Sequence, residues 1–174
     1  MTVGADARLN DVDLDAIGAL VDAVQADPAT AQTTWAAQVN WKGGFQSESR
    51  VRNFAPVASD EPSAIGGADT APNPVEQLLA ALGNCLAVGY AANASVAGIA
   101  IKSLSIDLKG DLNLKSFLGL DAGHAGFDSI TARVNLTSDA SREDIEALHA
   151  KVLALSPVGH TLRVAVPVSI GLAG

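Results

Sequence analysis

Apolar residues recur along this 174-residue chain with two periods, one typical of helices and the other of strands. Spacings of three and four predict amphipathic helices over 13–26 and 141–155. Strict alternation of apolar and polar positions predicts five strands. These are expected at 35–41, 45–54, 104–108, 130–136 and 164–172. The turn Lys42-Gly43-Gly44 joins the first two strands into a hairpin.

The longest apolar segment, 74–97, is predicted to form a helix that is buried on all sides. Asn73 takes the N-cap position, Pro74 the first helical position and Glu76 the third, which is close to a capping box. Gly98 occupies the position after the C-cap, and no charged residue lies between Glu76 and Gly98. A helix that is apolar on every face is expected at the centre of a molecule.

The order of these elements predicts an α+β fold, in which helices pack on an antiparallel sheet. Residues 1–11 are expected to be disordered, and 55–72, with three prolines and two adjacent glycines, to form a loop. Pro167 places the last strand at an edge or a bulge. The length suits one domain, whose core needs no disulfide.

The net charge of −8 argues against a nucleic-acid partner or an anionic membrane surface, although acidity is also a simple means of staying in solution. No apolar run is expected to span a bilayer, and the N-terminus lacks the features of a secretory signal. A single free cysteine then favours the reducing cytoplasm. The three histidines show no metal-ligand spacing, so no metal site is expected.

The sole cysteine, Cys85, is the strongest candidate for chemistry, because a thiolate is a potent nucleophile. The structural alternative is a buried cysteine that packs as a small hydrophobic residue. Cys85 lies about three turns from the start of its helix, beyond the reach of the helix dipole, so a reactive thiol needs a neighbouring cation. Candidate cations are Arg50 and Arg52, which alternation places on one face of their strand; a solvated strand face is the alternative.

Two segments together resemble the signature of OsmC-like proteins, the osmotically inducible and organic-hydroperoxide-resistance superfamily. The first is Pro72-Asn73-Pro74-Val75-Glu76-Gln77-Leu78-Leu79-Ala80-Ala81-Leu82-Gly83-Asn84-Cys85-Leu86-Ala87, and the second is Leu155-Ser156-Pro157-Val158-Gly159-His160-Thr161-Leu162. The resemblance implies an OsmC-like domain over 33–174, preceded by a helical extension at 1–32. It also implies an antiparallel sheet packed on the long central helix, and an intertwined homodimer with active sites at the subunit interface.

The same resemblance implies thiol-dependent reduction of organic hydroperoxides without a bound cofactor. A first cysteine attacks the peroxide, a second condenses with the resulting sulfenic acid, and an external dithiol resets the enzyme. An arginine and a glutamate hold the first cysteine as a thiolate. By this correspondence Cys85 is the peroxidatic residue, Glu76 is the candidate glutamate, and Arg52 is preferred to Arg50. Glu76 also has a purely local interpretation as a capping residue, because a straight helix places it about 13.5 Å from Cys85 and on the opposite face.

The chain departs from the family at the second cysteine, where it has Ser156. Serine cannot close a disulfide, so an external thiol has to resolve a Cys85 sulfenic acid. Three hypotheses follow: a one-cysteine peroxidase, an inactive dimer that binds a small apolar ligand, and a redox sensor. Ser156 and His160 do not make a hydrolase, because the sequence has no nucleophile elbow, no evident oxyanion donor and no placed acid.

Overall fold

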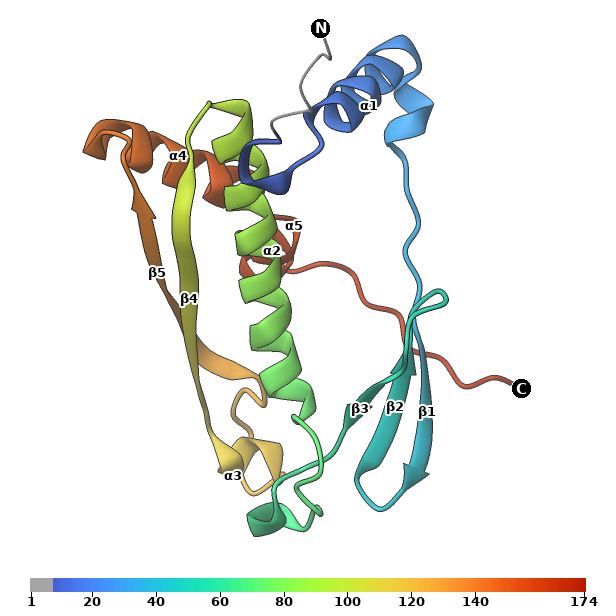
Figure 1. Cartoon of the computed structure of the whole chain (residues 1–174). Helices are drawn as coiled ribbons and strands as arrows, with labels where there is room; N and C mark the ends of the chain where they lie inside the picture. Colours follow the sequence, from blue (N-terminus) through green and yellow to red (C-terminus); the bar gives the residue numbers. More distant parts are fainter. Residues whose placement is uncertain (1–7) are drawn as a thin grey trace, which may run out of the picture. The chain divides into compact units, whose positions relative to one another are not determined.

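The computed structural model describes residues 8–174, which form an α+β fold of helices and antiparallel strands (Figure 1). The chain divides into two compact units, Asp13–Ala80 and Ala81–Gly174, and the short segment that ends at Val12 belongs to the second. The boundary lies within the long helix α2 (Pro74–Val96). The expected division between 1–32 and 33–174 stays a prediction.

The unit Ala81–Gly174 is built from most of α2 and a long hairpin, together with three shorter helices (Figure 1). Strands β4 (Ile101–Leu112) and β5 (Phe127–Ser138) pair antiparallel over almost their whole length. The pairs Leu104–Leu136 and Ile106–Val134 lie on the face of the hairpin that packs against the core. The connection holds α3 (Leu114–Phe117), and α4 (Arg142–Leu155) and α5 (Pro157–Arg163) follow β5.

The core of this unit lies where α2, α4 and the hairpin meet. Its buried residues are Leu86, Tyr90, Ala94, Ile99, Leu148 and Val152. A Cβ on Gly89 would lie 3.0 Å from Val152 Cγ1, so the glycine allows α2 and α4 to approach closely. The Tyr90 hydroxyl and His149 Nδ1 share a hydrogen bond between the two helices, and burial raises the pKa of Tyr90.

Asn10 fastens the N-terminal segment to the end of α2, which corrects the expected disorder for residues 8–11. Its side-chain amide donates to Ser95 Oγ (2.9 Å) and to the Ile99 carbonyl (3.0 Å), and its oxygen accepts from Ile101 N (2.8 Å). The residue has a φ of 56°, in the left-handed region that asparagine tolerates well. The expectation for residues 1–7 lies outside the described residues.

The unit Asp13–Ala80 contains a separate three-stranded sheet and an N-terminal helix, α1 (Leu14–Ala26), which Asp13 caps. The turn η2 (Pro28–Ala31) follows α1. Strands β1 (Gln38–Gly43), β2 (Gln46–Arg50) and β3 (Val57–Ser59) are antiparallel in the order β1-β2-β3. The sequence predicted a loop where β3 lies, because three residues are too few to display an alternating pattern.

A buried carboxylate organises the segment between β3 and α2, which includes the turn η3 (Ser63–Ile65). Asp60 is 1% exposed and accepts hydrogen bonds from Glu61 N (2.8 Å), Thr70 Oγ1 (2.8 Å) and Thr70 N (3.2 Å). The Thr70 hydroxyl bond is the main cause that lowers the pKa of Asp60 to about 2, and the backbone donors add to it. This proline-rich loop is therefore ordered by one ionised side chain.

The C-terminal segment is not a strand, contrary to the prediction for 164–172. Residues 164–174 have no regular secondary structure, and the alternating apolar side chains are all exposed. These are Val164, Val166, Val168, Ile170 and Leu172. A strand requires a hydrogen-bonded neighbour, and the described residues supply none to this segment.

By length and mean hydropathy alone, α2 would suffice to cross a membrane, which corrects the expectation that no apolar run is long enough. The helix has 23 residues, four of which are buried in the described structure. The core helix of a folded domain meets the same criteria. The buried face of α2 carries Leu86, Tyr90 and Ala94, so its later turns form the core helix of the unit Ala81–Gly174. The prediction that this helix is buried on all sides is wrong, because Val88 and Val96 are 69% and 58% exposed.

We predict that the charge of Asp60 stabilises the fold. Its pKa is about 2 in the folded chain against an ordinary value of 3.8, so the stabilisation is fully present above pH 4 and is lost as the pH falls through 2. Asp60→Asn should unfold at a lower urea concentration than wild type at pH 7, and the difference should shrink towards pH 2. Asp69→Asn, an exposed change in the same loop, is the control. An equal loss of stability in both variants would contradict the prediction.

Candidate thiol site

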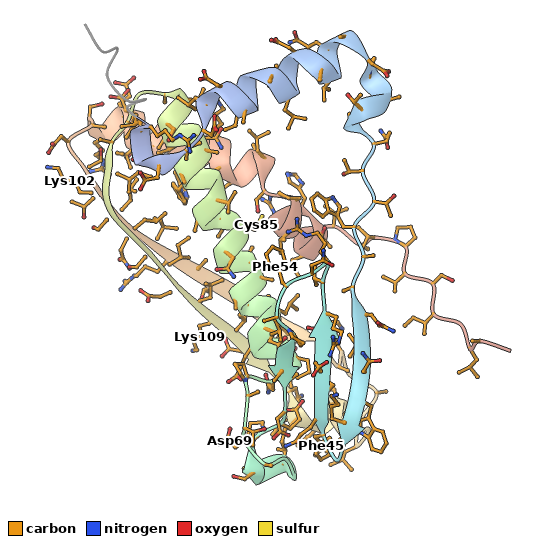
Figure 2. The ribbon with its side chains drawn as sticks, turned by 45° about the vertical axis from the view of Figure 1, so that its right-hand side comes forward. Phe45, Phe54, Asp69, Cys85, Lys102 and Lys109 are labelled. Carbon is orange, nitrogen blue, oxygen red and sulfur yellow. The ribbon has the colours of Figure 1, made fainter. Side chains whose placement is uncertain are left out.

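Cys85 and Ser156 lie in contact, although 71 residues separate them in the sequence. The distance between Cys85 Sγ and Ser156 Oγ is 3.2 Å, which is hydrogen-bonding distance when sulfur takes part. Ser156 is 4% exposed, and Cys85 is half-buried in the middle of α2 (Figure 2). Of the five predicted site residues, these two are therefore brought together.

The local sequence explains how Ser156 is held. Ser156 is the N-cap of α5, where its hydroxyl oxygen accepts a hydrogen bond from Gly159 N (3.1 Å). Pro157 takes the first helical position, where a missing N–H costs nothing. A Cβ on Gly159 would lie 2.9 Å from Ser156 Oγ, so only glycine leaves room for this arrangement. Because the hydroxyl oxygen accepts from Gly159, its own hydrogen is free to point at the sulfur of Cys85.

A cavity of about 480 Å³ is lined in part by Ser156, within the unit Ala81–Gly174, while Cys85 itself is not in the lining. Its walls are mainly apolar, with side chains from α2, β5, α4 and α5. They include Leu82, Leu86, Phe127, Ile130, Leu153 and Leu162. The polar residues in the lining are Ser156 and Ser129, and the charged residues are Asp128 and Arg163. An apolar space of this size with a few polar groups is typical of a small-molecule site.

Glu76 has the local role that the sequence allowed for it. Its carboxylate accepts a hydrogen bond from Asn73 N (2.8 Å), and Asn73 Oδ1 accepts one from Glu76 N (2.9 Å). This is a reciprocal capping box at the start of α2. The side chain is engaged nine residues before Cys85 along a continuous helix. Its catalytic role stays a prediction.

Both candidate arginines belong to the unit Asp13–Ala80 and are engaged there. Arg50 pairs with Glu48 at 2.7 Å, and this guanidinium holds the pKa of Glu48 below its ordinary value. Arg52 is not part of the strand, contrary to the alternation argument, because β2 ends at Arg50. Its φ is 48°, and its guanidinium lies 4.6 Å from the centre of the Phe54 ring. The part of either arginine in activating Cys85 stays a prediction.

Sequence reasoning missed α5 and therefore missed Arg163, the one basic residue in the lining of the cavity. Its Nη2 donates to the Leu153 carbonyl (2.9 Å) and its Nε to the Gly159 carbonyl (3.1 Å). These bonds hold the guanidinium at the ends of α4 and α5. The signal was present in the sequence, because serine followed by proline and then by a short run without breakers marks a helix start.

The chemistry open to this site is that of one thiol with one hydroxyl. Within residues 8–174, no group of three His, Cys, Asp or Glu side chains is placed to hold a metal ion. The serine can donate to a thiolate or to an oxidised sulfur, but it cannot form a disulfide. The adjoining cavity can admit a small partly apolar molecule.

Comparisons with known proteins agree with this fold. A family model of OsmC-like proteins matches residues 66–171. An OsmC-like protein from Mycoplasma pneumoniae is 17% identical, with a TM-score of 0.67 over 77% of this chain and 90% of that one. An organic hydroperoxide resistance protein OsmC from Legionella pneumophila is 19% identical, with a TM-score of 0.59 over 76% of this chain and 92% of that one.

An organic hydroperoxide resistance protein from Elizabethkingia anophelis is 17% identical, with a TM-score of 0.54 over 76% of this chain and 91% of that one. A search of curated protein sequences gave no match. The family match includes α2 with Cys85 and the α4–α5 junction with Ser156, and it spans more than half of the chain. The chain belongs to the OsmC-like family.

Proposed function

We propose that this protein is a one-cysteine peroxidase that reduces organic hydroperoxides with the help of an external thiol. The observation that carries the proposal is the 3.2 Å contact between Cys85 Sγ and Ser156 Oγ. It places a hydroxyl at the position where the family resemblance implies a second cysteine. Membership of the family and the names of the Legionella and Elizabethkingia proteins support a role in defence against oxidative stress.

The proposed cycle has three steps. The Cys85 thiolate attacks the terminal oxygen of the hydroperoxide ROOH, the O–O bond breaks, and the alcohol ROH leaves with a proton. Cys85 is then a sulfenic acid. A thiol R′SH condenses with it, forming a mixed disulfide and water. A second R′SH attacks the mixed disulfide, which releases R′SSR′ and restores the thiol.

Ser156 has a positioning role in this proposal. Its oxygen accepts a hydrogen bond from Gly159 N, and in this proposal its hydrogen is directed to the sulfur of Cys85, which lies 3.2 Å away. A donor there can hydrogen-bond the sulfur before the reaction and the oxidised sulfur after it. Ser156 can form a hydrogen bond with the Cys85 sulfur but no disulfide. The Cys85 sulfenic acid therefore persists until an external thiol reacts with it. The free thiol and its reductant both suit the cytoplasm, which we propose as the compartment.

The apolar surface of the unit Asp13–Ala80 supports the homodimer that the family resemblance implies. Val39 and Trp41 of β1 and Val57 of β3 share one face of the sheet, and they are 64%, 76% and 55% exposed. Exposed apolar side chains gathered on one sheet face are typical of an interface. We propose that a second copy of the chain covers this face, with no nucleic acid, membrane or metal as a partner.

We predict that Cys85→Ser abolishes consumption of cumene hydroperoxide in the presence of dithiothreitol, because no other thiol exists in the chain. The decay of the hydroperoxide is followed for wild type and variant side by side. Equal rates in the two proteins would overturn the peroxidase proposal. Inactivity of wild type would favour the ligand-binding alternative, for which the 480 Å³ cavity is the candidate site.

Ser156→Cys should convert the site to a two-cysteine centre. With the two side-chain atoms already 3.2 Å apart, oxidation should close a disulfide across 71 residues, seen as the loss of two hydrogens in the intact mass. The loop-closure model expects about 4 kcal/mol of added stability for such a bond. The variant Ser156→Cys/Cys85→Ser is the control. Failure of the single variant to close a disulfide would show that the Cys85–Ser156 contact does not form in solution.

The dimer is tested with two adjacent residues that point to opposite faces of β1. Val39→Glu places a charge on the apolar face and should lower the mass in light scattering from two chains to one. Gln38→Glu adds the same charge to the opposite face and should leave two chains. A wild-type protein with the mass of one chain would contradict the dimer.

A further inference from the structure

The cavity beside Ser156 has features that the proposed cycle does not yet use, and they bear on which thiol resolves Cys85. The inference rests on the proposed function, because it concerns the second reactant of the same site. Ser156 both contacts the Cys85 sulfur and lines the cavity. Cys85 itself is not in the lining, so a molecule seated in the cavity approaches the sulfur past Ser156, whose Oγ lies 3.2 Å from it.

The shape of the site favours a small reductant. The cavity of about 480 Å³ is within the range of roughly 300–1,000 Å³ that holds small ligands. Ser156 is 4% exposed and Cys85 is half-buried, so a reductant has to fit a partly buried contact. A low-molecular-weight thiol is small enough to reach such a site. A dithiol on the flat surface of another protein is kept away by the residues around it.

The charges of the lining select among small thiols. Arg163 donates hydrogen bonds to the backbone carbonyls of Gly159 and Leu153. Because both acceptors are uncharged, these bonds do not neutralise the positive charge of the guanidinium. Within residues 8–174, no carboxylate forms an ion pair with it, Asp128 of the same lining included. Arg163 is exposed, and a guanidinium held by two carbonyls in the lining of a mainly apolar cavity is a binding group for a carboxylate.

We infer that the cavity binds a low-molecular-weight thiol that carries a carboxylate, and that Arg163 selects it as the resolving thiol. The apolar side chains hold the carbon skeleton, Arg163 holds the carboxylate, and the thiol faces the Cys85–Ser156 pair. Arg163 is in this view a specificity-determining residue for the reductant.

The test uses thiol–disulfide exchange, which needs no hydroperoxide. Reduced protein is mixed with 4,4′-dithiodibutyrate, bis(2-hydroxyethyl) disulfide or cystamine, which are anionic, neutral and cationic. The Cys85 thiolate attacks one sulfur, the S–S bond breaks, and one thiolate leaves, so the mixed disulfide is counted by intact mass. Each rate is divided by the rate of the same disulfide with N-acetylcysteine, which removes differences in intrinsic reactivity.

We expect the anionic disulfide to react about fivefold faster than the neutral one after this correction, and the cationic one to be slowest. The net charge of −8 alone would give the reverse order, so the expected order isolates a local cation. Arg163→Gln should remove the preference. Arg142→Gln is the control, because this arginine pairs with Glu146 on an exposed turn of α4 and does not line the cavity.

Equal or reversed rates with wild type would overturn the inference, and this result needs no variant to fold. A preference that survives Arg163→Gln would overturn the assignment to Arg163. Exchange with the expected order but no consumption of cumene hydroperoxide would leave the thiol site standing and remove the peroxidase proposal. Hydroperoxide consumption with no preference among the disulfides would support the peroxidase proposal and overturn the inference about the thiol site.

Discussion

The contact between Cys85 and Ser156 is the interaction on which this account depends. It joins the middle of α2 to the junction of α4 and α5, so it requires the core packing around Leu86, Tyr90 and Val152. It also requires the α5 N-cap, since that cap orients the hydroxyl. If both residues were cysteines, their side chains would have to move from this 3.2 Å separation to about 2.05 Å to close a disulfide. Replacing one sulfur with oxygen keeps the geometry and removes the covalent outcome.

With serine in place of the second cysteine, an external thiol has to carry out the step that a second cysteine of the chain would perform. A two-cysteine centre stores its oxidising equivalents in a protein disulfide, which a reductant meets at the surface. A one-cysteine centre keeps them on a single sulfur, which a thiol has to reach directly. The cavity lined by apolar side chains and Arg163 suits such a thiol, because the apolar side chains can bind its carbon atoms and Arg163 can bind its carboxylate.

Much of the fold follows from the sequence because its signals are local. The N-cap and proline before α2, the Ser141 cap of α4 and the alternation in β4 and β5 each determine an element through neighbouring residues. The errors occurred where partners are distant. Strand β3 exists through its pairing with β2, and Asn10 is ordered by groups about 85 to 91 residues away. The segment 164–172 has a strand pattern without a neighbour to pair with.

The candidate site was predictable to a similar extent. The motifs identified Cys85 and Ser156, but only the packed structure shows their contact and the cavity beside it. Arg163 was not predicted, because its place depends on α5 and on two carbonyls from different helices. Arg52 was assigned to a strand that ends two residues earlier, since a positive φ interrupts the alternation.

The most direct test of the central claim is the mass of the protein after one equivalent of cumene hydroperoxide in the absence of thiol. A peroxidatic Cys85 should gain one oxygen that persists until a thiol is added and then gives way to a mixed disulfide, and in a parallel sample the same sulfenic acid should form a dimedone adduct. An unchanged thiol in both samples would show that Cys85 is a packing residue of α2.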